Sequence, residues 1–389
     1  MASIEELKRL SILEVAERLG MQLKRVGNQT YVWKEHESFT INSRDNYFNW
    51  FARSTGGDVI ALVQTIQEEL TGQEISFKQA KHFLEEGNFE VVNVTNVPEK
   101  EPFSYYLKPY ETKFIEGREY LKEIRGLSDE TIDFFGEKGV LAQATKKTND
   151  YYEPVIVFKS LDHENEIIGA SLQGIRENHD LYERGRLKQI MRASDGMTGM
   201  HIDIGTPKRL VFTEAPIDLM SYYELKKDTL QDVRLVAMDG LKESTISRHV
   251  AELLFEMGEI KGEIESATIP TFLANLAEVT TFFKEGKHQD LITLAVDNDK
   301  AGHTFIERLT DKKITFVSDL PPTTKSQEKI DWNDYLKEIK EKALDRSQEQ
   351  QKKERTYLHM GSLQPEAEGS TSPVLETSTF ERSVTSRPT

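Results

Sequence analysis

Residues 208–337 alternate between short apolar runs typical of strands and longer amphipathic runs typical of helices. The expected strands are 209–213, 233–238, 291–296 and 314–317, and the expected helices are 216–227, 244–257 and 300–309. A further apolar-striped helix, 268–284, is expected between the second and third strands. This alternation predicts an α/β fold, in which a parallel sheet is flanked by the crossover helices that join its strands.

Acidic residues follow the first and third of these strands at the point where each strand ends. Glu214 and Asp218 follow the first strand, and Asp297 and Asp299 follow the third. Because the carboxyl ends of parallel strands line the crevice where open α/β sheets bind ligands, we expect these side chains to lie together.

Carboxylates gathered in one crevice repel one another unless a cation lies between them. Hard oxygen ligands suit Mg²⁺ or Mn²⁺, and a site of this kind typically acts on phosphate groups. Taken alone, the Asp297-Asn-Asp299 run also fits a solvated turn that caps a helix, and Glu214 also fits an exposed strand end. Together, and with Gly302 allowing the next helix to approach closely, the two runs favour a metal site.

The acidity of the chain limits the partners that it is expected to bind. Its 389 residues, with 50 basic against 66 acidic side chains, carry a net charge of −16 and are enough for several domains. This balance is evidence against tight, nonspecific binding of duplex nucleic acid, which usually needs a basic surface. It does not weigh against a metal-centred active site. Since the sequence has no cysteine, disulfides and thiolate metal sites are excluded.

Targeting and membrane signals are not evident in the sequence. No run approaches the ~20 apolar residues of a membrane span. The first residues, Met-Ala-Ser-Ile-Glu-Glu, lack the positive charge and the apolar region of a signal peptide. We therefore expect a cytoplasmic protein without a membrane partner.

The rest of the chain is expected to form smaller units. Residues 1–90 are typical of a small α+β module, with a capping box at Ser11 and Glu14, further helix caps at Asp58 and Ser76, and strands at 30–33, 38–41 and 47–51. The remaining expected units are a linker at 91–104, an α+β region at 105–206 with a helix that Gly136 and Gly139 end, the sheet at 207–340, and a charged helix with a disordered tail at 341–389.

Two acidic motifs resemble those of the TOPRIM domain, which bacterial-type primases share with type IA and type II topoisomerases and some nucleases. They are the Glu-x-x-x-Asp run at 214–218 and the Asp-x-Asp-x-Ala-Gly run at 297–302. The run Lys329-Ile-Asp-Trp-Asn-Asp334 resembles a third acidic motif of the primase branch, except that Ile330 separates the lysine from the aspartate. The chain thus resembles bacterial DnaG-type primases, and among them the short primase-like proteins of plasmids and conjugative elements.

This resemblance implies a TOPRIM-type sheet and assigns roles to its acids. The catalytic residues would be Glu214, Asp297 and Asp299. The metal ligands would be Glu214, Asp218, Asp297, Asp299, Asp331 and Asp334. The last two also have a simpler interpretation, because Asp-Trp-Asn-Asp before a helical run is typical of a helix N-cap.

The resemblance extends upstream, to the part of the primase core that holds template and nucleotide. It is carried by residues 169–176, Gly-Ala-Ser-Leu-Gln-Gly-Ile-Arg, and 194–199, Ser-Asp-Gly-Met-Thr-Gly. The residues that would bind nucleic acid or nucleoside triphosphate are Arg176, Arg184, Arg186, Lys188 and Lys329. The alternative for the upstream residues is a solvated charged loop, because acidic residues are interspersed among them.

The first module resembles the zinc-ribbon domain that precedes the core of bacterial primases. A zinc ribbon needs four ligands, mostly thiolates, and this sequence has no cysteine, so no zinc is expected. The aromatic residues that we expect to form a small core in its place are Trp33, Phe39, Tyr47, Phe48, Trp50 and Phe51. The alternative is an aromatic platform on which single-stranded bases stack.

The function implied by the resemblance is that of a DNA primase-like nucleotidyltransferase. It would make short primers on single-stranded DNA from nucleoside triphosphates, with Mg²⁺ or Mn²⁺, in the replication or transfer of a mobile element. A replicative helicase and conjugation or replication proteins are candidate partners. The alternatives are a metal-dependent TOPRIM nuclease and a non-catalytic nucleic-acid-binding replication protein.

Overall fold

The computed structural model describes residues 3–50, 55–73, 75–92, 102–148, 151–261, 269–323 and 329–361. The chain divides into one unit at Met1–Ile339 and another at Lys340–Thr389. The expected linker at 91–104 and the expected disordered tail lie mostly outside the described residues. Within the described ranges, no helix is long and apolar enough to cross a membrane.

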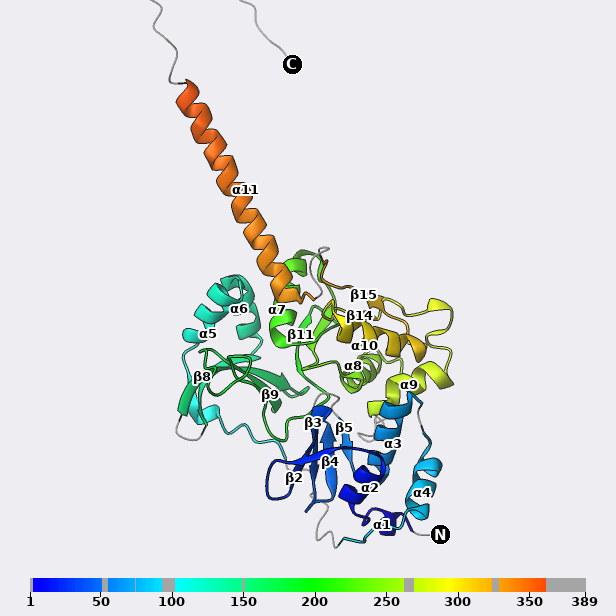
Figure 1. The fold of residues 1–389 in the computed structure, drawn as a ribbon. Helices are drawn as coiled ribbons and strands as arrows, with labels where there is room; N and C mark the ends of the chain where they lie inside the picture. Colours follow the sequence, from blue (N-terminus) through cyan, green and yellow to red (C-terminus); the bar gives the residue numbers. More distant parts are fainter. Residues whose placement is uncertain are drawn as a thin grey trace, which may run out of the picture. The chain divides into compact units, whose positions relative to one another are not determined.

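The N-terminal sheet is antiparallel and its strands pair in chain order (Figure 1). Its strands are β1 (Leu23–Arg25), β2 (Thr30–Trp33), β3 (His36–Asn42), β4 (Tyr47–Trp50) and β5 (Thr55–Gly57). The helices of this module are α1 (Ile4–Leu7), α2 (Ile12–Arg18), α3 (Val59–Thr71) and α4 (Phe77–Glu86). The predicted α+β module is present, although α1, β1 and β5 were not predicted.

The helix caps of this module agree with the sequence except at one side chain. Ser11 accepts the N–H of Glu14 at 3.4 Å, as expected. The Glu14 carboxylate, however, accepts the N–H of Glu90 at 2.6 Å, so the expected capping box is only half formed. Asp58 caps α3, and Ser76 completes a capping box at α4.

The core of this module is aromatic. Trp33, Phe39, Phe48 and Trp50 are almost completely buried. The ring centroids of Phe39 and Phe48 lie 5.0 Å apart, and those of Phe39 and Trp50 lie 5.3 Å apart. These four rings therefore hold the sheet against its helices and are not free to stack on bases. Phe51 lies outside the described residues.

The middle sheet is also antiparallel, in the order β10-β9-β8-β7-β6. Its strands are β6 (Glu111–Thr112), β7 (Leu141–Thr148), β8 (Tyr151–Leu161), β9 (Ile167–Gly174) and β10 (Lys188–Ile190). Helices α5 (Glu116–Glu119) and α6 (Asp129–Glu137) belong to the same region. Of the two glycines expected to end α6, Gly136 lies inside the helix, so that part of the prediction was wrong, while Gly139 forms the left-handed turn after it, with φ of 74°.

The third sheet has the order β11-β13-β12-β14-β15, with β11 antiparallel and the other strands parallel. Its strands are β11 (Met200–Ile204), β12 (Arg209–Thr213), β13 (Val233–Ala237), β14 (Ile292–Leu294) and β15 (Val317–Ser318). Its helices are α7 (Pro216–Lys226), α8 (Glu243–Glu256), α9 (Ile269–Val279), α10 (Lys300–Asp311) and the start of α11 (Trp332–Gly361). The predicted parallel sheet is confirmed.

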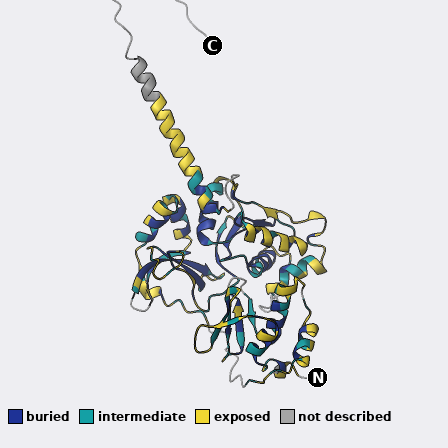
Figure 2. Cartoon of the chain, in the orientation of Figure 1, coloured by how far each residue is buried: buried dark blue, intermediate teal, exposed yellow. Residues whose placement is uncertain are grey.

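Separate hydrophobic clusters cover the two faces of the third sheet. Its central strands β12, β13 and β14 are accordingly buried (Figure 2). Alternate residues of each strand point to opposite faces, as in β12, where Val211 belongs to one cluster and Phe212 to the other. The first cluster contains α7, the start of α11 and residues of the middle sheet. The second contains α8, α9 and α10. Helices thus flank the third sheet on both faces, and the first cluster fixes the middle sheet beside it.

Candidate functional site

Acidic residues lie at the carboxyl ends of three adjacent parallel strands. Glu214 follows β12, Asp239 follows β13, and Asp297 comes shortly after β14. Backbone hydrogen bonds continue past the strands and hold these ends in place. The Gly240 N–H donates to the carbonyl of Glu214 at 2.9 Å, and the Ala295 N–H donates to the carbonyl of Phe212 at 2.8 Å.

Asp297 and Asp299 flank an ammonium group. Lys329 Nζ lies 3.4 Å from Asp297 Oδ2 and 3.1 Å from Asp299 Oδ2. Asp299 also caps α10 by accepting the N–H of Gly302 at 2.9 Å. A side chain at position 302 would collide with the carbonyl oxygen of Asp297, so glycine is what lets α10 come this close. Asp297 Oδ1 is buried and has no hydrogen-bond partner.

The pKa values of Asp297, Asp218 and Glu214 are raised, and neighbouring acidic charges contribute to each shift. Burial, followed by the charges of Glu214 and Asp331, raises the pKa of Asp297 to about 7. Burial, followed by Asp331 and Asp297, raises the pKa of Asp218 well above its usual range. Burial also raises the pKa of Glu214, although Lys329 opposes it. These carboxyls therefore form one electrostatically coupled group.

Asp299 behaves differently from its neighbours. Burial alone would raise its pKa, but the N–H of Gly302 and the Lys329 ammonium lower it below the usual value. Asp299 is therefore ionised over a wider pH range than the other acids of the group.

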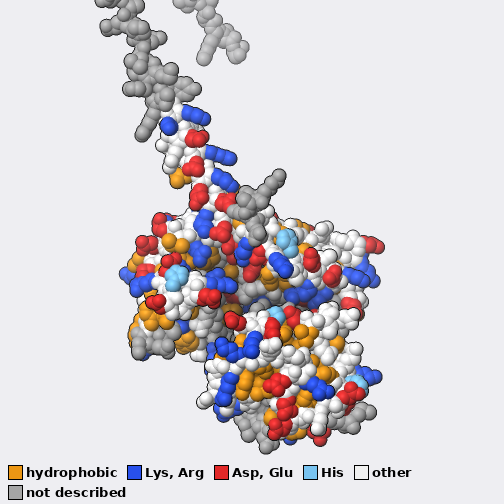
Figure 3. Space-filling model, in the orientation of Figure 1, with side chains coloured by type: hydrophobic (Ala, Val, Ile, Leu, Met, Phe, Trp, Pro, Cys, Tyr) orange, Lys and Arg blue, Asp and Glu red, His pale blue; other side chains and the backbone are white. Residues whose placement is uncertain are grey.

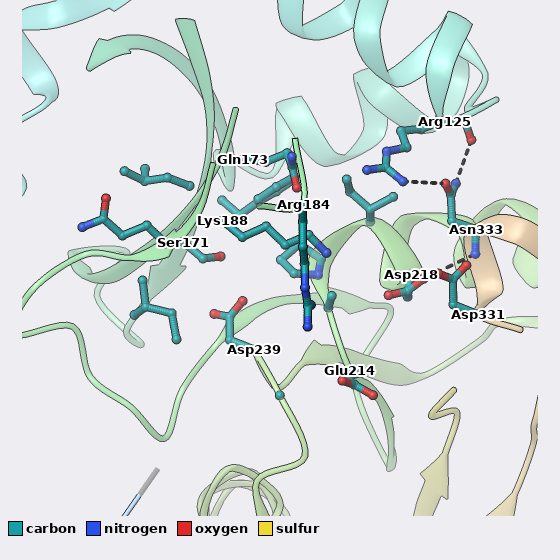
Figure 4. A pocket seen from close by; sticks show the side chains of 18 residues that line it. Arg125, Ser171, Gln173, Arg184, Lys188, Glu214, Asp218, Asp239, Asp331 and Asn333 are labelled. Atoms are coloured by element: carbon teal, nitrogen blue, oxygen red, sulfur yellow. Dashed lines mark hydrogen bonds between the residues drawn. The ribbon is translucent and has the colours of Figure 1, made fainter. Parts of the chain in front are cut away.

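A pocket of about 330 Å³ lies between the acidic strand ends and the middle sheet. Its acidic lining residues are Glu214, Asp218, Asp239 and Asp331, and its basic lining residues are Arg125, Arg184 and Lys188. Figure 4 shows Arg184 and Lys188 between Asp239 on one side and Asp218 and Asp331 on the other. The pocket thus combines groups that hold cations with groups that hold phosphate.

The other predicted basic residues do not line this pocket. Arg176 pairs with Glu116 at 3.0 Å, and Arg186 pairs with Glu177 at 3.1 Å and lies over the ring of Tyr120. Both line a separate cleft that contains several glutamates. On the face drawn in Figure 3, basic side chains are likewise interspersed with acidic ones.

Asp331 and Asp334, the two predicted acids at the start of α11, lie in different surroundings. Asp331 lines the pocket, and its Oδ1 also accepts the N–H of Asp334 at 2.7 Å, as a helix cap does. Asp334 is 53% exposed and pairs with Lys337 at 2.7 Å. Between them, the Asn333 N–H donates to Asp218 Oδ1 at 3.3 Å. The structure therefore brings Asp331, but not Asp334, to the other acids.

Sequence reasoning missed several residues of the pocket. Asp239 follows a buried parallel strand, as Glu214 does. The same sequence signal could therefore have identified it. Arg125 and Asn333 had no such signal, because they are 208 positions apart and meet through the Asn333 amide, which donates to the carbonyl of Arg125 at 2.7 Å.

The donor set of this group fits Mg²⁺ or Mn²⁺ in its chemistry. The atoms are carboxylate oxygens, Asp297 Oδ1 lacks a partner, and the Lys329 ammonium stands where a cation would neutralise Asp297 and Asp299. Within the described part of the chain, no three acidic or histidine side chains converge closely enough to hold an ion as they stand. Metal binding would therefore require displacement of Lys329, which is 60% exposed.

The raised pKa of Asp297 predicts how the stability of the metal-free protein depends on pH. Between its ordinary pKa of 3.8 and about 7, the folded chain retains a proton that the unfolded chain has released. This contribution to stability is complete below the lower value and is lost as the pH rises through the higher one. In thermal unfolding with EDTA, stability should fall more steeply with rising pH for the unsubstituted protein than for Asp297→Asn. Equal slopes would contradict the prediction.

Comparisons with known proteins give one relative and several distant structures. No family model matches the chain. The uncharacterized protein pXO2-78 of Bacillus anthracis is 27% identical over 372 residues, which cover 93% of this chain and 95% of that protein. The Aquifex aeolicus primase (zinc-binding and RNA polymerase domains) is 14% identical with a TM-score of 0.33, over 89% of this chain and 85% of that one. The primase fragment of the bacteriophage T7 primase-helicase protein is 16% identical with a TM-score of 0.31, over 57% of this chain and 70% of that one.

Proposed function

We propose that the chain is a primase-like nucleotidyltransferase that makes short primers on single-stranded DNA. In this proposal the third sheet is a TOPRIM domain, and the middle sheet belongs to the part of the core that holds template and nucleotide. One observation supports it above the others: acidic ends of parallel strands and the basic residues Arg184 and Lys188 line the same pocket.

This combination matches the needs of phosphoryl transfer. A triphosphate is repelled by carboxylates alone, and basic residues alone would bind it without activating it. Arg184 offers a planar fork of donors to phosphate oxygens, and Lys188 adds a compact positive charge. Glu214, whose pKa burial raises, is suited to accept the proton of the attacking hydroxyl.

The proposed metal ligands are Glu214, Asp218, Asp297, Asp299 and Asp331, and the ion is Mg²⁺ or Mn²⁺. When bound, the metal would neutralise phosphate charge and help to align the attacking and leaving oxygens. Asp334 would join them only if the first turn of α11 rearranged, because its carboxylate pairs with Lys337.

The N-terminal module supports the same proposal by its place before the core. We propose that it corresponds to the zinc ribbon of primases, with the Trp33, Phe39, Phe48 and Trp50 core in place of the metal. Metal analysis of the purified protein tests this, since one bound zinc per chain would contradict it.

Primer synthesis is the direct test of the main proposal. The protein would be incubated with single-stranded DNA, labelled nucleoside triphosphates and Mg²⁺ or Mn²⁺, and the products separated by size. Short labelled primers are the expected result. Cleavage of the DNA without primers would favour a nuclease, and neither product would favour a non-catalytic binding protein.

Replacing Arg184 and Lys188 with glutamine should weaken nucleotide binding specifically. Hydrogen bonds to charged groups contribute about 1.5–3 kcal/mol each, so KM for nucleotide should rise roughly 10- to 100-fold for each single replacement. The matched control is Arg176→Gln, because that guanidinium pairs with Glu116 and lines a different cleft. An equal rise in KM in the control would contradict this assignment.

The biological setting is also proposed. The Bacillus anthracis relative is from a plasmid, which supports a role in the replication or transfer of a mobile element. A replicative helicase and conjugation or replication proteins are then the proposed partners. Stimulation of primer synthesis by the helicase of the same element would test this, and its absence would count against a helicase partner.

A further inference from the structure

The two ends of the pocket differ in chemistry. Asp218 and Asp331 lie at one end, and Asp239 and Ser171 lie at the other (Figure 4). Arg184 and Lys188 lie between them. A ligand that places its phosphates on these basic residues and toward the coupled acids therefore has another part left to contact Asp239.

The middle sheet presents an apolar row at the Asp239 end. Ser171 of β9 is paired with Phe158 of β8 and with Ile190 of β10, and all three line the pocket. Because directly opposed residues of antiparallel strands point to the same face, the three side chains form one row. Ile190 is 45% exposed although it is apolar. Such a row suits the flat face of a base.

The neighbouring row consists of Ile156, Gln173 and Lys188, and its charge at Lys188 suits phosphate. Lys188 is paired with Gln173 in the same sheet. The sheet therefore changes along the pocket from groups that bind a charged ligand to groups that contact a ring. A nucleotide has the same order of parts, with charged phosphates at one end and a flat base at the other.

Two polar groups, Ser171 in this row and the nearby Asp239, lie at the same end of the pocket. The Ser171 hydroxyl is buried and makes no hydrogen bond of good geometry, although it lies close enough to favour the ionised form of Asp239. Burial nevertheless raises the pKa of Asp239, against the opposing charge of Lys242. A ligand that donates hydrogen bonds to this carboxylate would therefore be bound favourably.

The backbone fixes Asp239 in this position. Its φ is 53°, a left-handed conformation that aspartate and asparagine tolerate better than most residues. Gly240, with φ of 111°, completes the turn and donates its N–H to the carbonyl of Glu214 at 2.9 Å. The turn thus ties Asp239 to the strand end that carries the proposed catalytic glutamate.

Among the bases, guanine alone presents two adjacent donors, N1–H and the N2 amino group, which match the two oxygens of a carboxylate. Adenine and cytosine place an acceptor beside their amino group, and uracil places its N–H between two acceptors. We propose that Asp239 recognises this edge of guanine and that the pocket selects guanosine triphosphate. The inference rests on the proposed function, since it assumes that Arg184 and Lys188 hold the triphosphate.

Equilibrium binding of nucleotides to the full chain, without template, tests the inference. The probes are the triphosphates of guanosine, adenosine, inosine and xanthosine, and inorganic tripolyphosphate. Guanosine triphosphate should bind at least about 10-fold more tightly than adenosine triphosphate, the discrimination typical of a bidentate contact to a base. Inosine triphosphate, which lacks the amino group, should fall between them.

The Asp239→Asn variant gives the sharper test, because it should change the preferred base from guanine to xanthine. Asparagine presents one acceptor and one donor, which match N1–H and the C2 carbonyl of xanthine. The variant should therefore prefer xanthosine over guanosine triphosphate, and should fold because asparagine also adopts left-handed φ. The matched control is Asp228→Asn, an exposed acid after α7, which should keep the guanosine preference.

Several outcomes would overturn the inference, and they separate it from the proposed function. Equal binding of guanosine and adenosine triphosphates would overturn the inference. An equal loss of affinity for all nucleotides in Asp239→Asn would overturn it as well. If tripolyphosphate still binds in either case, the proposed function remains intact. The protein could instead bind a guanine-containing DNA oligonucleotide through Asp239 and show no preference for guanosine triphosphate. That result would assign the Asp239 contact to the template and overturn the nucleotide assignment. Absence of binding by every triphosphate and by tripolyphosphate would overturn both proposals.

Discussion

Replacement of Asp297 and Asp299 by asparagine should abolish primer synthesis while leaving the chain folded. We expect kcat to fall by at least about 10³-fold, the scale seen when groups that stabilise transition-state charge are removed. The two carboxylates lie on either side of the Lys329 ammonium, and Asp297 is electrostatically coupled to Glu214. Asparagine keeps their size but removes the charge with which they would hold a metal ion.

The same variant should not be less stable without metal. Removing the Asp297 charge relieves a buried carboxylate that Glu214 and Asp331 repel. Asparagine at position 299 still accepts the N–H of Gly302, because it is among the best N-cap residues. The ion pair of Asp299 with Lys329 is lost, but Lys329 is 60% exposed, so this loss should cost little. Thermal unfolding in EDTA should therefore give an equal or higher midpoint than that of the unsubstituted protein.

Metal binding adds a second measurement to this experiment. A ligand that binds only the folded state raises the unfolding midpoint, so millimolar Mn²⁺ should stabilise the unsubstituted protein and not the double variant. The matched control is Asp290→Asn, an exposed acid just before β14, at the opposite end of the strand. Primer synthesis that survives the double substitution, or equal stabilisation of both proteins by Mn²⁺, would contradict the proposed metal site.

The third sheet was predictable because its signals are local. Buried parallel strands are short apolar runs, and crossover helices carry their own periodicity, so β12, β13 and β14 were placed within a few residues. The edge strands were less predictable. β11 runs antiparallel and lies outside the strand–helix alternation, and β15 begins later than expected because Ile314 packs into the core instead.

Glu214, Asp297 and Asp299 were predictable for the same reason, since they follow strands whose ends are fixed by the sheet. Which of the predicted basic residues would line the pocket was not predictable, because Arg176, Arg184 and Arg186 lie in a segment between β9 and β10 without periodicity. Which cleft each residue lines depends on partners distant in sequence, such as Glu116, which pairs with Arg176. Composition and spacing do not encode such pairings.

The importance of Asn333 was hidden for a similar reason. In the sequence it is one polar residue of a capping run at the start of a helix. In the structure its backbone N–H contacts Asp218, and its amide donates to Ser221 at 3.0 Å and to the carbonyl of Arg125. It therefore joins α7, the start of α11 and the helical turn that ends at Arg125 beside the pocket, which no local pattern could indicate.

Trp332, the neighbour of Asn333, should be the most damaging single position for stability. Its indole is almost completely buried, its Nε1–H donates to the carbonyl of Ala295 at 2.9 Å, and its ring packs against Tyr222 with centroids 4.9 Å apart. Trp332→Ala should lower the free energy of unfolding by about 3–5 kcal/mol, the usual cost of deleting a buried tryptophan side chain. Urea denaturation followed by circular dichroism measures this loss.

Two further variants show what the indole contributes. Trp332→Phe keeps a ring but leaves the carbonyl of Ala295 without its donor, so it should cost about 1–3 kcal/mol. Ile339→Ala, an exposed position on the same helix, should change stability by no more than about 0.5 kcal/mol. Since Ala295 lies two residues before Asp297, and Asp331 precedes Trp332, loss of the indole should also lower primer synthesis at temperatures where the variant remains folded. A small loss of stability with intact synthesis would mean that the start of α11 does not hold Asp331 and Asp218 in the site.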